Sequence, residues 1–107
     1  MIDHIFEEIR AERRRQDEKF GEQNMSMIGC SGDEISNRHR EENKKLADAL
    51  KTINDKPGSA SWESILLEEV YEAFAEADPE KQREEMIQVA AVAVKIIEYL
   101  ERKIHES

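Results

Sequence analysis

Two long segments with apolar residues at helical spacing flank the dipeptide Asp78-Pro79, and this pairing restricts the fold more than any other feature. Aspartate suits the position before a helix and proline suits the first helical position, so the dipeptide both ends one helix and begins the next. Because the break is so short, the two helices are predicted to form a tight antiparallel hairpin. On a helical wheel, the helix before Asp78 has an apolar face that consists of Trp62, Leu66, Val70, Ala73, Phe74 and Ala77.

Capping and breaking signals along the chain predict four helices in all. The first takes Asp3 as its N-cap and runs to about residue 19, and the second covers about residues 34–54. The third is capped by Ser61 and covers residues 62–77, and the fourth begins at Pro79 and continues for roughly 25 residues. The apolar positions of the second helix are few: Leu46, Ala49, Leu50 and Ile53. The sequence therefore predicts an all-α fold with a single domain over residues 1–107.

The segment GEQNMSMIGCSGD, residues 21–33, is predicted to be a loop. It contains three glycines, is rich in polar side chains and shows no periodicity. We expect it to contribute nothing obvious to the core, and either to be mobile or to close over a ligand.

The composition narrows the class of protein. Hydrophobic and charged residues each make up 38% of the chain, with four glycines and two prolines, which suits a compact helical protein. The net charge of −9 argues against non-specific binding to nucleic acid or to anionic membrane. The single cysteine, Cys30, excludes an internal disulfide. The N-terminal residues lack the pattern expected of a signal peptide, and the apolar run 89–94 is too short to span a bilayer. We therefore expect a soluble, cytoplasmic protein.

Glutamates crowd the edges of the apolar faces in the predicted hairpin. Glu69 and Glu72 lie beside the apolar face of the third helix, whereas Glu68 points further out. A hairpin that turns at residues 78–79 places Glu72 opposite Glu85 and Glu69 opposite Gln88. Packed helices lie about 8–10 Å apart, so these side chains can converge on one ion. Three carboxylates and an amide oxygen suit a hard cation, Mg²⁺ or Mn²⁺.

An acidic helix edge also has a simpler interpretation, since runs of glutamate commonly form a solvated face. Two acidic clusters placed symmetrically about one turn and close to the core favour the metal site, because uncompensated like charges there require a cation. Both interpretations remain open at this point.

The glutamate pattern resembles that of a known family. EEVYE (68–72), followed twelve residues later by EMIQ (85–88), is similar to the EExxE and ExxD motifs of the MazG-like all-α NTP pyrophosphohydrolases. The stretches 12–24, 61–76 and 88–102 also look like sequence blocks of phage and bacterial MazG-like proteins. The resemblance implies an oligomeric four-helix-bundle architecture and Mg²⁺-dependent hydrolysis of a nucleoside triphosphate to the monophosphate and pyrophosphate.

The resemblance also implies roles for individual residues. Glu69, Glu72 and Glu85 would be metal ligands, and Glu68 would help to position metal or water. Gln88 stands where the family has the Asp of ExxD. An amide ligates through its oxygen but brings no charge, so a catalytically weakened helical module that binds nucleotide or regulates is the alternative function.

Basic and aromatic residues supply candidates for substrate binding. No GxxxxGK[ST] motif occurs, so the phosphates are expected to be held through metal, with basic side chains assisting. Arg13 or Lys19 is expected to meet phosphate, and Gln16 and Phe20, on the inward face of the first helix, to hold the base. Trp62 either stacks on the base or belongs to the core. No role is assigned to Cys30 or to the three histidines, His4, His39 and His105, which show no ligand spacing.

The fourth helix predicts self-association. From Met86 to Ile97 its apolar residues surround most of the helix, so it must be buried on more than one side. A chain of this length with a mostly polar second helix cannot easily supply that cover. We therefore expect a homodimer or a homotetramer.

Overall fold

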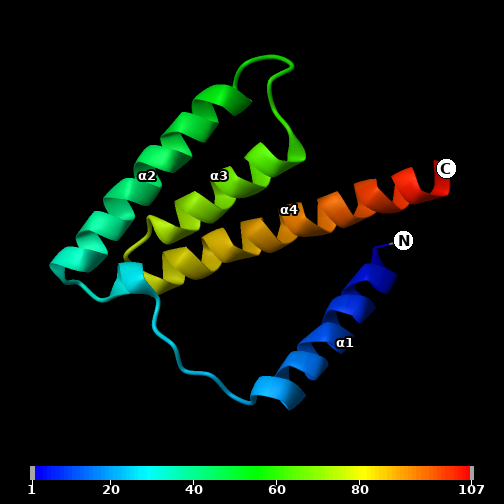
Figure 1. Ribbon diagram of the computed structural model, residues 1–107, viewed down its shortest axis with the longest axis horizontal. Coiled ribbons are helices and arrows are strands. Elements are labelled where there is room, and N and C mark those ends of the chain that lie inside the picture. Colours follow the sequence, from blue (N-terminus) through cyan, green and yellow to red (C-terminus); the bar gives the residue numbers. More distant parts are fainter. Residues whose placement is uncertain (1, 107) are drawn as a thin grey trace. The chain divides into compact units, whose positions relative to one another are not determined.

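The computed structural model describes residues 2–106, which form four α-helices and one 3₁₀ helix, without β-strands. The helices are α1 (Asp3–Phe20), α2 (Glu34–Asn54), α3 (Trp62–Phe74) and α4 (Pro79–Glu106), and the 3₁₀ helix η1 (Ile28–Cys30) precedes α2 (Figure 1). The all-α prediction is confirmed. No helix in the described part of the chain is long and apolar enough to cross a membrane.

Contacts divide the chain into two compact units. One comprises residues 26–96, with η1, α2, α3 and the first part of α4, and the other comprises residues 2–25 and 97–106. The continuous helix α4 contributes to both. The single-domain organisation stays a prediction.

Local capping explains where α3 and α4 begin. The Ser61 side chain accepts a hydrogen bond from the backbone of Ser64, whose own side chain accepts one from the Ser61 backbone. This reciprocal pair satisfies two amides that the first turn of a helix leaves unbonded. Pro79 opens α4, as predicted, and the Asp78 side chain accepts from the Glu80 amide at 3.3 Å.

Two predicted helix ends are wrong. Asp3 is already helical and the N-cap position belongs to Ile2, whose side chain makes no capping bond. The helix α3 ends at Phe74 rather than at residue 77. It can stop early because the Gln82 side chain of α4 donates to the carbonyl oxygen of Ala73 at 3.1 Å, and so satisfies a terminal acceptor.

The helices α2 and α3 lie side by side (Figure 1), and the face of α2 that packs there is largely polar. Its buried or half-buried positions recur mostly at intervals of three and four residues: Ser36, His39, Arg40, Asn43, Ala47, Leu50 and Asn54. By contrast Leu46, Ala49 and Ile53, predicted as apolar positions of α2, are exposed. Hydrogen bonds allow this polar face to pack against α3, because Asn54 donates to Ser64 O at 3.2 Å and accepts from the Ser64 hydroxyl at 2.6 Å.

The segment predicted to be a loop without core contacts is partly packed. Gly29 is buried, and the Ser36 hydroxyl and the Arg40 guanidinium donate to the carbonyls of Ile28 and Gly29. The Cys30 thiol donates to the Gln82 side chain at 3.3 Å. Therefore η1 is fixed to α2 and to the start of α4, and the expectation that the segment adds nothing to the core is wrong for Gly29 and Cys30.

Candidate metal centre

Three glutamates from α3 and α4 converge where the predicted hairpin register placed two of them. Glu69 and Glu72 are three residues apart on α3 and so lie on one side of that helix. Chain reversal after Phe74 brings Glu85 of α4 to the same place. One carboxylate oxygen from each of the three lies within 4.8 Å of the others, and all three residues are half-buried.

Two of these carboxylates are incompletely satisfied. Oε2 of Glu69 and Oε2 of Glu85 are buried and have no hydrogen-bond partner among the described residues. Leaving a buried polar atom unpaired costs about 1–3 kcal/mol, and more for a charged group. A hard cation bound between the carboxylates would supply the missing partner, so the residues present fit Mg²⁺ or Mn²⁺.

Burial and the closeness of the three carboxylates raise the pKa values of two of them. Burial raises the pKa of Glu69, and the negative charges of Glu85 and Glu68 raise it further. Burial, a hydrogen bond with Glu68 and the charges of its neighbours raise the pKa of Glu72 to about 7. The folded protein without metal therefore favours a proton on the cluster, and a divalent cation competes with that proton.

Glu68 lies closer to the cluster than the sequence predicted. It is half-buried rather than directed outward, and it accepts a hydrogen bond from the Asn54 amide at 2.8 Å. Since Glu68 also shares a hydrogen bond with Glu72, it connects α2 to the cluster. This arrangement suits a positioning role for Glu68.

A cavity of about 280 Å³ adjoins the cluster and introduces a basic residue that sequence reasoning missed. Glu72 and Glu85 line it together with Lys44 and Asp48 of α2. A neighbouring cavity of about 270 Å³ is lined by Lys44 and by Arg40, one helical turn before it. The spacing of Arg40 and Lys44 was visible in the sequence, but the polar character of α2 gave no sign that this face meets α3.

The remaining predicted metal ligand, Gln88, is exposed and lies three residues after Glu85 on α4. This position places it on the same side of the helix, one turn away. Ligation by Gln88 stays a prediction.

The predicted substrate-binding residues of α1, namely Arg13, Gln16, Lys19 and Phe20, are exposed. Arg13 forms an ion pair with Asp17 at 3.3 Å and a long hydrogen bond to Gln16, at 3.4 Å. The Lys19 ammonium lies 5.2 Å from the ring centre of Phe20, which is 56% exposed. The exposure follows from the packing of α1, which buries only Ile5 among its residues. Roles in substrate binding stay predictions for these residues.

Trp62 is the first residue of α3 and is half-buried. Its partial exposure is compatible with both predicted roles, in the core or against a base.

The cluster has the chemistry of a hard-cation site: three oxygen donors in one place, two with unpaired buried oxygens, and a lysine lining the adjacent cavity. Such a site can hold a divalent ion and accept an anionic ligand beside it. Comparison of the chain with known protein families, with curated proteins and with solved structures found no match in any of the three.

Proposed function

We propose that this protein is a Mg²⁺-dependent nucleoside triphosphate pyrophosphohydrolase that releases a nucleoside monophosphate and pyrophosphate. The observation that carries the proposal is the convergence of Glu69, Glu72 and Glu85 with two buried, unpartnered carboxylate oxygens. The resemblance of residues 68–72 and 85–88 to the MazG-like motifs supports the same reaction.

The metal would be held by Glu69, Glu72 and Glu85, with Gln88 as an additional oxygen ligand, and Mn²⁺ could replace Mg²⁺. When bound, the ion supplies charge neutralisation for the phosphates and lowers the pKa of a coordinated water. Glu68 orients Glu72 through their hydrogen bond and is itself held by Asn54.

Lys44 is the basic residue best supported for binding the triphosphate. It lines the cavity next to Glu72 and Glu85, and Arg40 lies one turn away on the same helix. A lysine ammonium beside the metal would attract phosphate oxygens that the glutamates otherwise repel. Arg13, Lys19, Gln16, Phe20 and Trp62 remain candidates for further phosphate and base contacts.

Gln88 favours a second candidate function, a helical module that binds nucleotide or regulates without turnover. The amide contributes no charge and the side chain is exposed, so the site has three carboxylates where the family motif has a further acid. Such a module would bind a triphosphate and leave it intact.

Product analysis separates these functions. The protein is incubated with Mg²⁺ and a panel of standard and modified nucleoside triphosphates, and pyrophosphate is measured separately from orthophosphate. We expect pyrophosphate and monophosphate from at least one substrate, and no product after chelation. Orthophosphate with diphosphate as the only products contradicts the proposed reaction, whereas binding without turnover supports the module.

Variants connect the reaction to the cluster. Glu69→Gln should lower activity by more than about 100-fold, because even indirect partners of metal ligands are worth about 10- to 100-fold. Lys44→Ala should mainly raise the substrate concentration needed for half-maximal rate. Glu84→Gln, at an exposed residue next to Glu85, removes the same charge and serves as the control. Equal losses in Glu69→Gln and Glu84→Gln would contradict the assignment of the site.

A further inference from the structure

A second group of metal-ligating side chains lies in the unit formed by residues 2–25 and 97–106, and the reaction proposed above does not use it. His4 Nε2 lies 3.0 Å from Oε1 and 2.7 Å from Oε2 of Glu101, a residue 97 positions away in the sequence. Ligand atoms of His4, Glu8 and Glu101 all lie within 4.8 Å of one another. The folded chain thus joins an imidazole and two carboxylates that the sequence keeps far apart.

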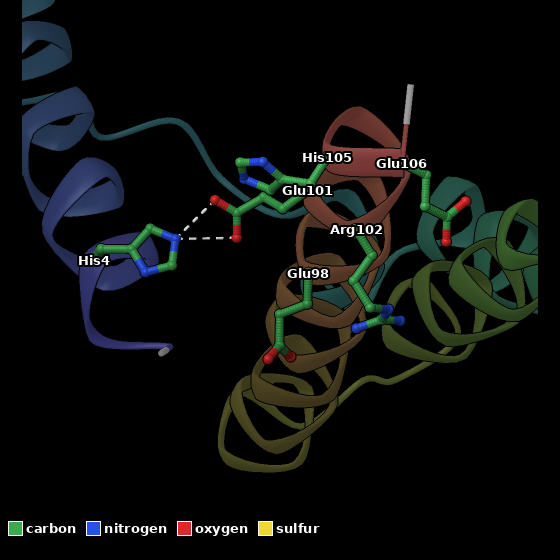
Figure 2. A pocket seen from close by; sticks show the side chains of 6 residues that line it. All are labelled: His4, Glu98, Glu101, Arg102, His105 and Glu106. Atoms are coloured by element: carbon green, nitrogen blue, oxygen red, sulfur yellow. Dashed lines mark hydrogen bonds and ion pairs between the residues drawn. The ribbon is translucent and has the colours of Figure 1, made fainter.

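His105 completes a regular pattern. His4 and Glu8 are four residues apart on α1, and Glu101 and His105 are four residues apart on α4, so each pair lies on one side of its helix. Figure 2 shows His4 facing Glu101, with His105 beside Glu101. A cavity of about 540 Å³ is lined by His4, Glu101 and His105, together with Glu98, Arg102 and Glu106. His4 and Glu101 belong both to this cavity lining and to the group of close ligand atoms, Glu8 belongs to the group, and His105 belongs to the lining.

The donor set distinguishes this group from the glutamate cluster. Imidazole nitrogen suits Zn²⁺ and its neighbours in the first transition series, whereas sites made only of carboxylates suit Mg²⁺ and Mn²⁺. Two histidines and two carboxylates satisfy the four-coordinate geometry that Zn²⁺ prefers. Ligand atoms around tetrahedral zinc lie about 3.4 Å apart, given bonds of about 2.1 Å, and those of His4, Glu8 and Glu101 already lie within 4.8 Å of one another. A side-chain rotation of the exposed His105 would supply the fourth ligand.

We propose that His4, Glu8, Glu101 and His105 bind a zinc-class divalent ion in a site separate from the glutamate cluster. The ion takes the place of the direct contact that now joins His4 to Glu101. It fastens the first turn of α1 to the last turns of α4, beside the buried side chain of Ile5. This fastening matters locally because the N-cap of α1 has no side-chain hydrogen bond.

The surrounding charges allow a cation there. Arg102 is the basic residue in the cavity lining, and Glu98, Glu101 and Glu106 outnumber it. Glu106 is already paired with Lys103 at 3.3 Å, which leaves Glu98 as the nearby carboxylate that offsets Arg102. A bound ion would add to the stability of the folded chain by mass action.

The test is a calorimetric titration of the full-length protein with Zn²⁺, repeated with Co²⁺, whose absorption spectrum reports nitrogen and oxygen ligands. We expect saturable binding of one ion per chain that excess Mg²⁺ does not displace. His4→Ala and His105→Ala should each weaken binding by about 100-fold or more, since these changes remove ligands and the loss of outer partners alone costs about 10- to 100-fold. His39→Ala removes the third histidine, which lies outside this group, and should bind zinc as the unaltered protein does.

Circular dichroism of each variant before metal is added shows whether it is folded. If His4→Ala loses helix content, His105→Ala carries the test, because His105 is exposed and lies in the last turn of α4. Absence of saturable binding in the unaltered protein means that His4 and Glu101 form a surface ion pair only, and overturns the proposal. Equal loss in His39→Ala overturns it as well.

A Glu69→Gln variant keeps this proposal separate from the proposed reaction. It should lose Mg²⁺-dependent pyrophosphate release and retain zinc binding. Zinc binding lost in Glu69→Gln but retained in both histidine variants would assign the ion to the glutamate cluster and overturn the second site.

Discussion

Glu72 changes its charge in a pH range where an ordinary glutamate is already ionised. Its pKa is about 7 in the folded protein, against an ordinary value of 4.5. Between these values the folded state binds more protons than the unfolded state, so the free energy of unfolding falls as pH rises. The contribution of Glu72 to the free energy of unfolding is complete below pH 4.5 and is lost as the pH rises above about 7.

This shift predicts a pH-dependent melting temperature in metal-free protein. From about pH 5 to about pH 8 the unaltered protein should lose stability, and Glu72→Gln should remove most of that loss and melt higher at the upper end, by on the order of 5 °C. Thermal melts in chelator across this range measure the effect, with Glu84→Gln as the control. A melting temperature that does not change with pH in the unaltered protein would show that Glu72 titrates normally.

Gln88 provides a test of the metal site by gain of charge. Gln88→Asp places a carboxylate one turn after Glu85, so Mg²⁺ affinity should rise by roughly threefold to tenfold through added attraction. Because position 88 is exposed, the added repulsion in metal-free protein should be small. Titration of the melting temperature with Mg²⁺ measures both effects, and Gln23→Asp makes the same charge change at an exposed residue outside the cluster. Unchanged affinity in Gln88→Asp would remove residue 88 from the list of ligands.

At the scale of elements, η1 shows how closely the segment before α2 is packed. A Cβ at Gly29 would lie 3.2 Å from the carbonyl oxygens of Phe74 and Glu76 and 3.3 Å from Cγ of Arg40. Two of these atoms belong to the backbone at the end of α3 and cannot move without shifting the turn. The absence of a side chain at residue 29 therefore allows η1 to approach α3.

We predict that Gly29→Ala destabilises the protein by about 1–3 kcal/mol, the usual effect of overpacking. The measurement is chemical denaturation, and Met25→Ala, at a side chain 80% exposed, is the control from the same segment. If both variants unfold at the same denaturant concentration, η1 is not held against α3 in solution.

The elements also show which features a sequence can predict. The starts of α3 and α4 were predictable because Ser61 and Asp78 accept hydrogen bonds from amides within one turn, and Pro79 has a backbone angle already suited to the first helical position. The buried face of α2 was not predictable from apolar periodicity, because Ser36 and Asn54 pack through hydrogen bonds to Ile28 of η1 and Ser64 of α3. The early end of α3 likewise depends on Gln82, a side chain from the next helix.

The same distinction applies to the candidate sites. The convergence of Glu72 with Glu85 follows from a short turn and helical spacing, so sequence reasoning could reach it. The cavity residue Lys44 and the pair of His4 with Glu101 depend on contacts between distant parts of the chain. No local pattern in the sequence indicates such contacts.

At the scale of the whole molecule, the amount of apolar surface left uncovered is large. Four hydrophobic residues of the described chain are buried, namely Ile5, Ala47, Ala73 and Val94. By contrast Met86, Ile87 and Leu100 of α4 are 43%, 56% and 49% exposed. Apolar surface of this extent typically marks an interface.

We therefore predict that the protein is a homodimer or a homotetramer in solution, with α4 contributing to the interface. Ile87→Lys should lower the mass measured by light scattering toward that of the monomer, 12.4 kDa. Gln88→Lys adds the same charge at the next exposed position and should leave the mass unchanged if residue 88 lies outside the interface. A monomeric unaltered protein would contradict the prediction.

The two unpartnered oxygens of Glu69 and Glu85 also bear on the history of the chain. Most random substitutions that relieve such crowding would increase stability, and a lineage that no longer needed the site would be free to accept them. Glutamate at 69, 72 and 85 together is thus an arrangement that neutral drift would tend to erode.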